Sequence, residues 1–96
     1  MEKRIGRVTH YFNRIGVAVL DLSDELSLGD FVRIEGHTSE FVQCVCSMEI
    51  EHRKMQVVGP GAEVALKVDE PARAGDVVYL VDPQDATEVG AHWGIG

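Results

Sequence analysis

Hydrophobic and polar residues alternate in short runs along most of this chain, and turn-forming residues separate the runs. Alternation with a period of two is typical of a β-strand, whereas a helix would spread the same residues around its circumference. No window of the sequence forms a convincing amphipathic helix. The pattern predicts strands at residues 5–12, 15–20, 31–35, 42–50, 55–58, 63–69 and 77–81.

The same pattern predicts which side chains face the core. The run at 15–20 is apolar on both faces, so we expect both of its faces to be buried. In the run at 42–50, the face that carries Cys44 and Cys46 is expected to point inward, where free cysteine packs as a small hydrophobe. The inward residues expected in two other runs are Val32, Ile34, Val64, Leu66 and Val68.

Six or seven short strands in about 77 residues predict an all-β fold. A single open sheet of this size would leave one face and two edges unprotected, so we expect a closed or nearly closed antiparallel barrel. Two similar turns, at residues 28–32 and 74–78, each place Gly-Asp before an apolar strand, which is turn chemistry. Residues 1–81 are predicted to form the barrel domain and residues 82–96 a flexible tail.

The chain has 96 residues and a net charge of −7, with 16 acidic residues against 9 lysines and arginines. A chain of this length has room for one domain. The acidic balance disfavours sequence-independent binding to nucleic acid and docking on anionic lipid. No apolar run is long enough for a membrane span, and no signal-peptide pattern is present, so we expect a cytoplasmic protein without a membrane partner.

The two cysteines are separated by one residue, a spacing that would strain a disulfide and fits a reducing compartment. Together with His37 and His52 they supply four soft zinc ligands in principle. Structural zinc sites, however, use two to four residues between cysteines. Core packing is therefore the preferred interpretation of Cys44 and Cys46, and we expect no metal and no cofactor.

Most catalytic signatures are absent. The sequence contains no GxxxxGK[ST], GxGxxG, HExxH or GxSxG motif, so we expect a protein that is not an enzyme and has no catalytic residues. The densest polar cluster comprises Glu49, Glu51, His52, Arg53 and Lys54. It is interpreted either as a solvated turn with local charge pairing or as a recognition patch, in which Arg53 binds a phosphate or carboxylate and His52 stacks on a base.

A second cluster, of His10, Tyr11, Phe12 and Arg14, combines aromatic rings with a cation. Such a cluster forms a stacking platform for single-stranded nucleic acid, or else it packs within the first hairpin. The candidate binding residues are His52, Arg53, Glu51, Arg14 and Tyr11.

Five short motifs, taken in order, resemble a known family. They lie at residues 5–8, 28–34, 48–54, 61–66 and 74–78, and together they resemble the second domain of elongation factor Tu and related translational GTPases. The chain is still more similar to the small standalone proteins called translation elongation factor-like, and a similar barrel is found in the C-terminal domain of U32-family peptidases.

The resemblance implies a six- or seven-stranded antiparallel Greek-key barrel without catalysis of its own. In the elongation factor this domain helps to hold the aminoacylated end of tRNA, and in related factors it contacts the ribosome. His52 and Arg53 match the place where the family has polar residues near that end, with Glu51 or Glu49 as the neighbouring acid.

Two hypotheses for the function therefore remain. The first is a binding module that contacts tRNA or the ribosome. The second is a protein-interaction module related to the accessory barrels of peptidases, which docks through a sheet face or through Trp93 in the tail. The net charge favours a protein partner and the resemblance favours RNA, while the oligomeric state is left open.

Overall fold

The computed structural model describes residues 2–84, and from Glu2 to Asp82 the chain consists of strands, turns and loops without a helix. In that part of the chain no helix could cross a membrane. The tail expected at 82–96 falls almost entirely outside the described residues. The ten strands are β1 (Glu2–Phe12), β2 (Val17–Leu22), β3 (Leu26–Ser27), β4 (Phe31–Glu35), β5 (Glu40–Cys44), β6 (Met48–Ile50), β7 (Arg53–Lys54), β8 (Val57–Val58), β9 (Glu63–Lys67) and β10 (Val77–Val81).

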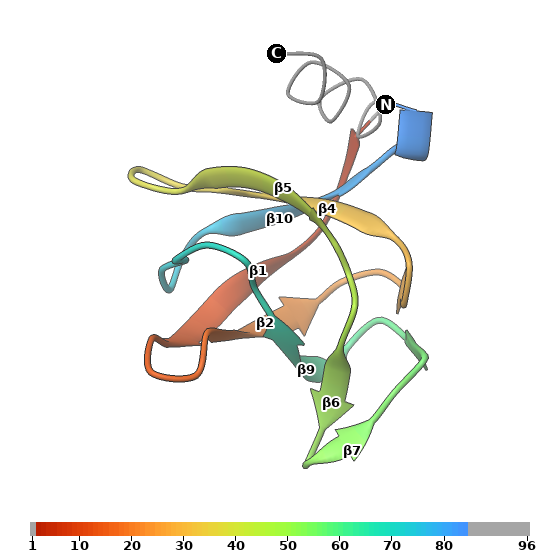
Figure 1. The fold of residues 1–96 in the computed structure, drawn as a ribbon. Helices are drawn as coiled ribbons and strands as arrows, with labels where there is room; N and C mark the ends of the chain where they lie inside the picture. Colours follow the sequence, from red (N-terminus) through yellow and green to blue (C-terminus); the bar gives the residue numbers. More distant parts are fainter. Residues whose placement is uncertain (1, 85–96) are drawn as a thin grey trace.

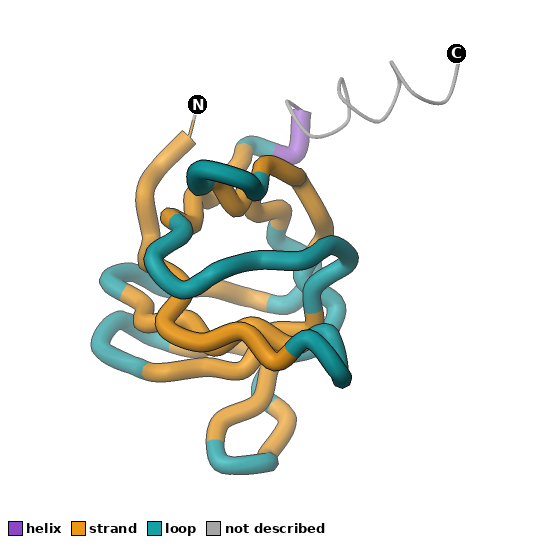
Figure 2. Tube along the Cα trace, turned by 90° about the vertical axis from the view of Figure 1, so that its left-hand side faces the viewer, coloured by secondary structure: helices purple, strands orange, loops and turns teal. Residues whose placement is uncertain are grey.

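Eight of these strands form one antiparallel sheet in the order β5-β4-β10-β1-β2-β9-β6-β7, and β3 pairs with β8 in a separate two-stranded ladder. The large sheet curls around the core, as Figure 1 and Figure 2 show. The all-β prediction is confirmed, but the prediction of a closed barrel with six or seven strands is wrong. The sheet is open, because β5 and β7 each have a ladder partner on one side only.

A side chain, not a strand pair, joins the open end of the sheet at β5 to the end of β9. The Gln43 Nε2 atom donates a hydrogen bond to the Lys67 carbonyl oxygen at 2.9 Å, and the Asp69 amide donates one to Gln43 Oε1 at 2.7 Å. Gln43 is only 4% exposed. Its carboxamide therefore satisfies backbone groups that a ladder would satisfy in a closed barrel.

The core contains the inward residues that clean alternation predicts. Val32, Ile34, Val64 and Leu66 are fully buried and Val68 is nearly so, which confirms their assignment. The rest of the buried hydrophobic cluster consists of Ile5, Val8, Ala18, Leu20, Leu22, Leu26, Phe41, Val45, Met48, Val58, Ala72 and Val78.

The run at 15–20 is buried on one face only. Ala18 and Leu20 are fully buried, but Val17 and Val19 on the opposite face are only half-buried. The expectation that both faces are buried is therefore wrong for the outer face, because no other layer of the described chain covers it. The run at 55–58 is also shorter than expected, since only β8 forms there. It pairs with β3, which lies between residues 20 and 31, where no strand was predicted.

The inward assignment of Cys44 and Cys46 is wrong, because both side chains are exposed. The run at 42–50 is two strands with opposite phase: Gln43 and Val45 point inward, and Met48 begins the second phase. Two hydrogen bonds hold Val45 against the preceding turn, and Gln43 is needed at the open end of the sheet. Both constraints override the alternation of apolar residues.

The first Gly-Asp turn shows how Val45 is held. Gly29 has φ 90°, and its amide donates to the Val45 carbonyl oxygen at 2.8 Å. The Val45 amide in turn donates to the Asp30 carbonyl oxygen at 2.8 Å. The Asp30 carboxylate accepts the Ser27 amide at 2.9 Å, which closes the turn.

The second Gly-Asp turn repeats the same set of bonds around Val8 in β1. Gly75 has φ 97°, and its amide donates to the Val8 carbonyl oxygen at 2.8 Å. The Val8 amide donates to the Asp76 carbonyl oxygen at 2.8 Å, and the Asp76 carboxylate accepts the Arg73 amide at 2.9 Å. The resemblance between the two turns in sequence therefore reflects a repeated structural unit.

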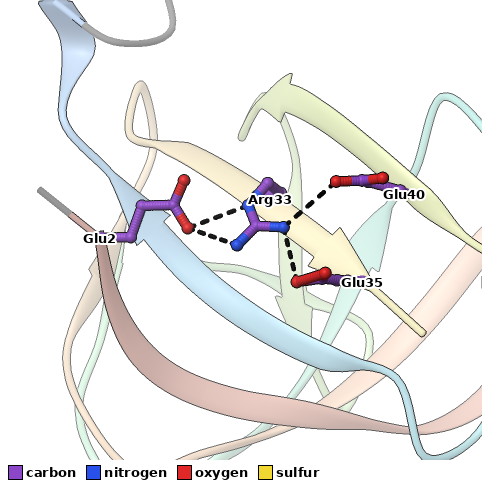
Figure 3. A network of polar contacts seen from close by, with 4 residues as sticks. All are labelled: Glu2, Arg33, Glu35 and Glu40. Atoms are coloured by element: carbon purple, nitrogen blue, oxygen red, sulfur yellow. Dashed lines mark hydrogen bonds and ion pairs between the residues drawn. The ribbon is translucent and has the colours of Figure 1, made fainter.

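The strands that follow the two turns, β4 and β10, pair with each other so that Arg33 lies opposite Tyr79. The guanidinium lies 4.8 Å from the Tyr79 ring centroid. It donates hydrogen bonds to Glu2 at 2.6 and 2.9 Å and to Glu35 at 2.6 Å, and Figure 3 shows these contacts. Glu40 is a further partner at 3.5 Å. The hydrogen bonds that Arg33 donates to Glu2, and to a lesser extent the one to Glu35, raise its already high pKa. The network ties the start of β1 to β4 and β5.

Candidate docking groove beside a strained hairpin

The β6–β7 hairpin extends away from the rest of the sheet, at the bottom of Figure 1 and of Figure 2. Ile50 pairs with Arg53, so the turn between the strands has only two residues, Glu51 and His52. Their φ angles are 49° and 66°. Positive φ at both central residues is the signature of a type I′ turn, which matches the twist of the flanking strands.

The turn is strained because its residues are poorly suited to this conformation. Type I′ turns favour Asn-Gly, since other residues bring Cβ close to the backbone when φ is positive, at a cost of about 1–2 kcal/mol each. Within residues 2–84, Glu51 and His52 are the non-glycine residues with positive φ. Local strain of this kind is concentrated at functional sites, so the turn is a candidate recognition element.

A groove of about 500 Å³ lies between this hairpin and the turn that joins β1 to β2. Its lining is mostly apolar, with a few charged groups. The lining residues are Phe12, Ile15, Val17, Val19, Ser47, Glu49, His52, Ala65 and Lys67.

Strand register creates the apolar floor of the groove. Val17 pairs with Lys67 and Val19 pairs with Ala65, so the outer faces of β2 and β9 lie side by side. An antiparallel sheet with one solvated face normally carries polar residues on that face. Here the outer face instead carries Val17, Val19 and Ala65, which form an apolar strip that is partly exposed to water.

The wall of the groove is the 13–16 turn, which is held by β9. Lys67 Nζ donates a hydrogen bond to the Ile15 carbonyl oxygen at 2.6 Å, and the Val68 amide donates one to the Gly16 carbonyl oxygen at 2.9 Å. Gly16 has φ 63°, a conformation that glycine adopts without steric cost. Ile15 in the turn is 58% exposed, and Phe12, the last residue of β1, is 51% exposed.

The structure places the residues predicted for binding in three separate places. Glu51, His52 and Arg53 are exposed together at the end of the hairpin, and His52 lines the groove. Arg14 is exposed in the 13–16 turn but does not line the groove. Tyr11 is half-buried, packs against the core and borders a different hollow.

Sequence reasoning missed the apolar part of the groove. The missed apolar residues are Ile15, Val17, Val19 and Ala65, and the polar residues Ser47 and Lys67 beside them were missed as well. A signal was present, because the run at 15–20 is apolar on both faces and only one face is needed for the core. Excess apolar residues on such a strand indicate either burial in a second layer or a contact surface.

The groove is suited to binding a side chain of another molecule. Its apolar floor suits an aliphatic or aromatic side chain, while Glu49, His52 and Lys67 offer polar partners close by. In the described part of the chain, no three His, Cys, Asp or Glu side chains come close enough together to hold a metal ion. The cysteines and histidines that were weighed as zinc ligands are therefore not brought together.

No protein-family model matches the chain. Over 78 residues the chain is 36% identical to an uncharacterised protease of Methanocaldococcus jannaschii. The match covers 80% of this chain but only 19% of the protease, so the chain corresponds to a small part of that larger protein.

Two solved structures share the fold. Both are of the C-terminal domain of a Geobacillus thermoleovorans protein assigned as a U32 peptidase, one of them in selenomethionine form. One has a TM-score of 0.78 at 20% identity and covers 83% of this chain and 93% of the domain. The selenomethionine form has a TM-score of 0.75 at 22% identity and covers 79% and 96%. The expected likeness to the peptidase domain is confirmed at the level of the fold, whereas a translation-factor function gains no support.

Proposed function

We propose that this chain is a non-enzymatic accessory module that binds a larger protein through the groove beside the β6–β7 hairpin. The proposal rests on one observation above all: the chain has the fold of a domain that elsewhere forms part of a peptidase, and it displays an apolar groove on that fold. A match to 19% of a protease supports the same interpretation, because it places an equivalent unit inside a longer chain.

The exposed apolar residues of the groove give the docking its driving force. Full burial of a Phe or Ile side chain contributes about 1.5–3 kcal/mol, and Phe12 and Ile15 each have about half of that contribution still to gain. Aromatic and aliphatic side chains at the centre of a contact commonly dominate its affinity. The partner surface is therefore expected to present an apolar side chain to the floor of the groove.

The partner to test is the body of the matching protease. The Methanocaldococcus jannaschii protease without its matching segment would be mixed with this chain, and complex formation would be measured by size-exclusion chromatography with light scattering and by calorimetry. We expect a defined complex, because the chain replaces the missing segment. Absence of binding to the truncated protease would contradict the proposal.

A matched pair of variants tests the groove itself. Ile15→Ser removes an apolar side chain from the wall of the groove, and we expect it to weaken binding at least about tenfold. Val57→Ser is the control, since Val57 is similarly exposed at 51% but lies on β8 and does not line the groove. Equal effects of the two substitutions would show that the partner does not occupy the groove.

A further inference from the structure

A second and larger hollow, of about 970 Å³, lies between the end of β1 and two loops. The loops that border it are on the left of Figure 1, and they face the viewer in Figure 2. Residues 9–13, 38–39 and 71–74 line it. It contains His10 and Tyr11 of the aromatic-basic cluster, which the docking proposal does not use.

The two loops are fixed against each other and against β1. A Cβ atom on Gly36 would lie only 1.9 Å from Asp76 Oδ1, so the 36–39 turn packs directly on the second Gly-Asp turn. The Gly36 amide donates to the Ser39 carbonyl oxygen at 2.8 Å, which closes the first loop. The bonds between Val8 and the second Gly-Asp turn hold the other loop on β1. The hollow is therefore preformed.

The polar lining suits an anion. No Asp or Glu lines the hollow, although the chain contains 16 of them. Arg73 contributes an exposed guanidinium, and Thr38 and Ser39 contribute hydroxyl groups. The nearest aspartate along that loop, Asp76, is 4% exposed, and its carboxylate already accepts the Arg73 amide. An arginine with hydroxyl donors is a common arrangement for binding phosphate.

The aromatic lining suits a planar ring. His10 and Phe12 are two residues apart on β1, with ring centroids 6.3 Å apart and an angle of 34° between their planes. Phe12 is 51% exposed and Tyr11 is half-buried beside them. A base stacks favourably on such rings, and the contact tolerates any base because every base has a flat aromatic face.

We propose that this hollow binds a mononucleotide unit, with its base on the His10–Phe12 rings and its phosphate at Arg73 and Thr38. The unit is either a free nucleoside monophosphate or the end of a single-stranded RNA. The site holds one nucleotide, so one cation is enough to pair with its phosphate. A broad positive surface, which the net charge of −7 disfavours in this chain, is not required. Phe12 borders both the groove and this hollow, so the two sites share one side chain, but nucleotide binding does not require docking through the groove.

The experiment is a titration of the ¹⁵N-labelled chain, followed by heteronuclear NMR, with AMP, adenosine and inorganic phosphate. We expect saturable shifts from AMP at residues 9–13, 38–39 and 73–74. Arg73→Gln is expected to weaken AMP about tenfold while leaving adenosine unchanged, because it removes a charge-assisted hydrogen bond to phosphate. His10→Ala is expected to weaken both AMP and adenosine.

Arg4→Gln is the control, because Arg4 is an exposed arginine on β1, the strand that carries His10, but does not line the hollow. It should leave AMP binding unchanged, and equal loss from both arginine substitutions would overturn the proposal. So would the absence of saturable AMP shifts up to about 10 mM, roughly ten times a millimolar dissociation constant. A tetra-adenylate that binds the same residues more tightly than AMP would identify an RNA end, and weaker binding would identify a free nucleotide.

Discussion

The strained turn of the β6–β7 hairpin predicts that the chain can be made more stable at the expense of its contacts. The substitution is Glu51→Asn together with His52→Gly, which installs the residue pair that type I′ turns favour. Both native residues have positive φ, at 49° and 66°. Both are exposed, so the substitutions remove no core packing.

The expected gain follows from the backbone. Each side chain now costs about 1–2 kcal/mol in the left-handed region. Glycine at position 52 removes that cost, but it also destabilises the fold by about 0.5–1 kcal/mol because the unfolded chain gains conformational freedom. Asparagine at position 51 tolerates the conformation better than glutamate. The double variant should therefore be more stable by about 1–2 kcal/mol, which corresponds to a melting temperature about 5–10 °C higher.

The assay is thermal unfolding followed by circular dichroism, with urea unfolding as a second measure. His37→Gly is the matched control, since His37 is exposed in a turn and does not have positive φ. That substitution should lower stability by about 0.5–1 kcal/mol, because glycine brings only its entropic cost. If the double variant melts at or below the temperature of the native chain, the turn is not strained and the reasoning is wrong. The same variant should bind the protease body more weakly, because it removes His52 from the groove.

Other changes test the fold and the partner. Gln43→Leu should lower the free energy of unfolding by about 2–4 kcal/mol, because two buried backbone groups lose their partner; equal stability in urea unfolding would refute that role. Leu66→Asp should abolish cooperative unfolding by burying an unpaired charge, and a retained sharp transition would contradict its place in the core. Arg33→Gln should lower the free energy of unfolding by about 1 kcal/mol at low salt and by less in concentrated salt. A decrease that salt does not change would show that the ion pairs contribute nothing to stability. A titration with tRNA at about 50 and 200 mM salt tests the translation hypothesis, since binding that weakens with salt and with Arg53→Ala would support it, and no binding would reject it.

The sequence was most informative where a strand has one buried face and one exposed face. In β4 and β9 alternation alone identifies Val32, Ile34, Val64 and Leu66 as core residues. It failed in the run at 42–50, where the backbone changes phase and a polar residue, Gln43, takes an inward position. The partners of that side chain lie far away in the sequence, so local periodicity cannot reveal them.

The candidate site was predictable in part for the same reason. The polar cluster at the hairpin is contiguous in the sequence, so Glu51, His52 and Arg53 were recognised together. The groove is assembled from four strands, two turns and Ser47 just before β6, and only the register of β2 with β9 brings Val19 beside Ala65. The strained turn could not be predicted, because Glu-His is not a residue pair that marks a type I′ turn.

The repeated Gly-Asp turn has a consequence for how the two binding surfaces arise. Val45 and Val8 occupy equivalent anchored positions, each exchanging two backbone hydrogen bonds with its own turn. Ser47, which lines the groove, lies two residues after Val45, and Thr9, which lines the hollow, directly follows Val8. The same set of backbone hydrogen bonds therefore fixes the chain beside part of each surface. Side chains on either surface can be substituted without breaking those bonds, because the bonds involve backbone atoms of Val45 and Val8.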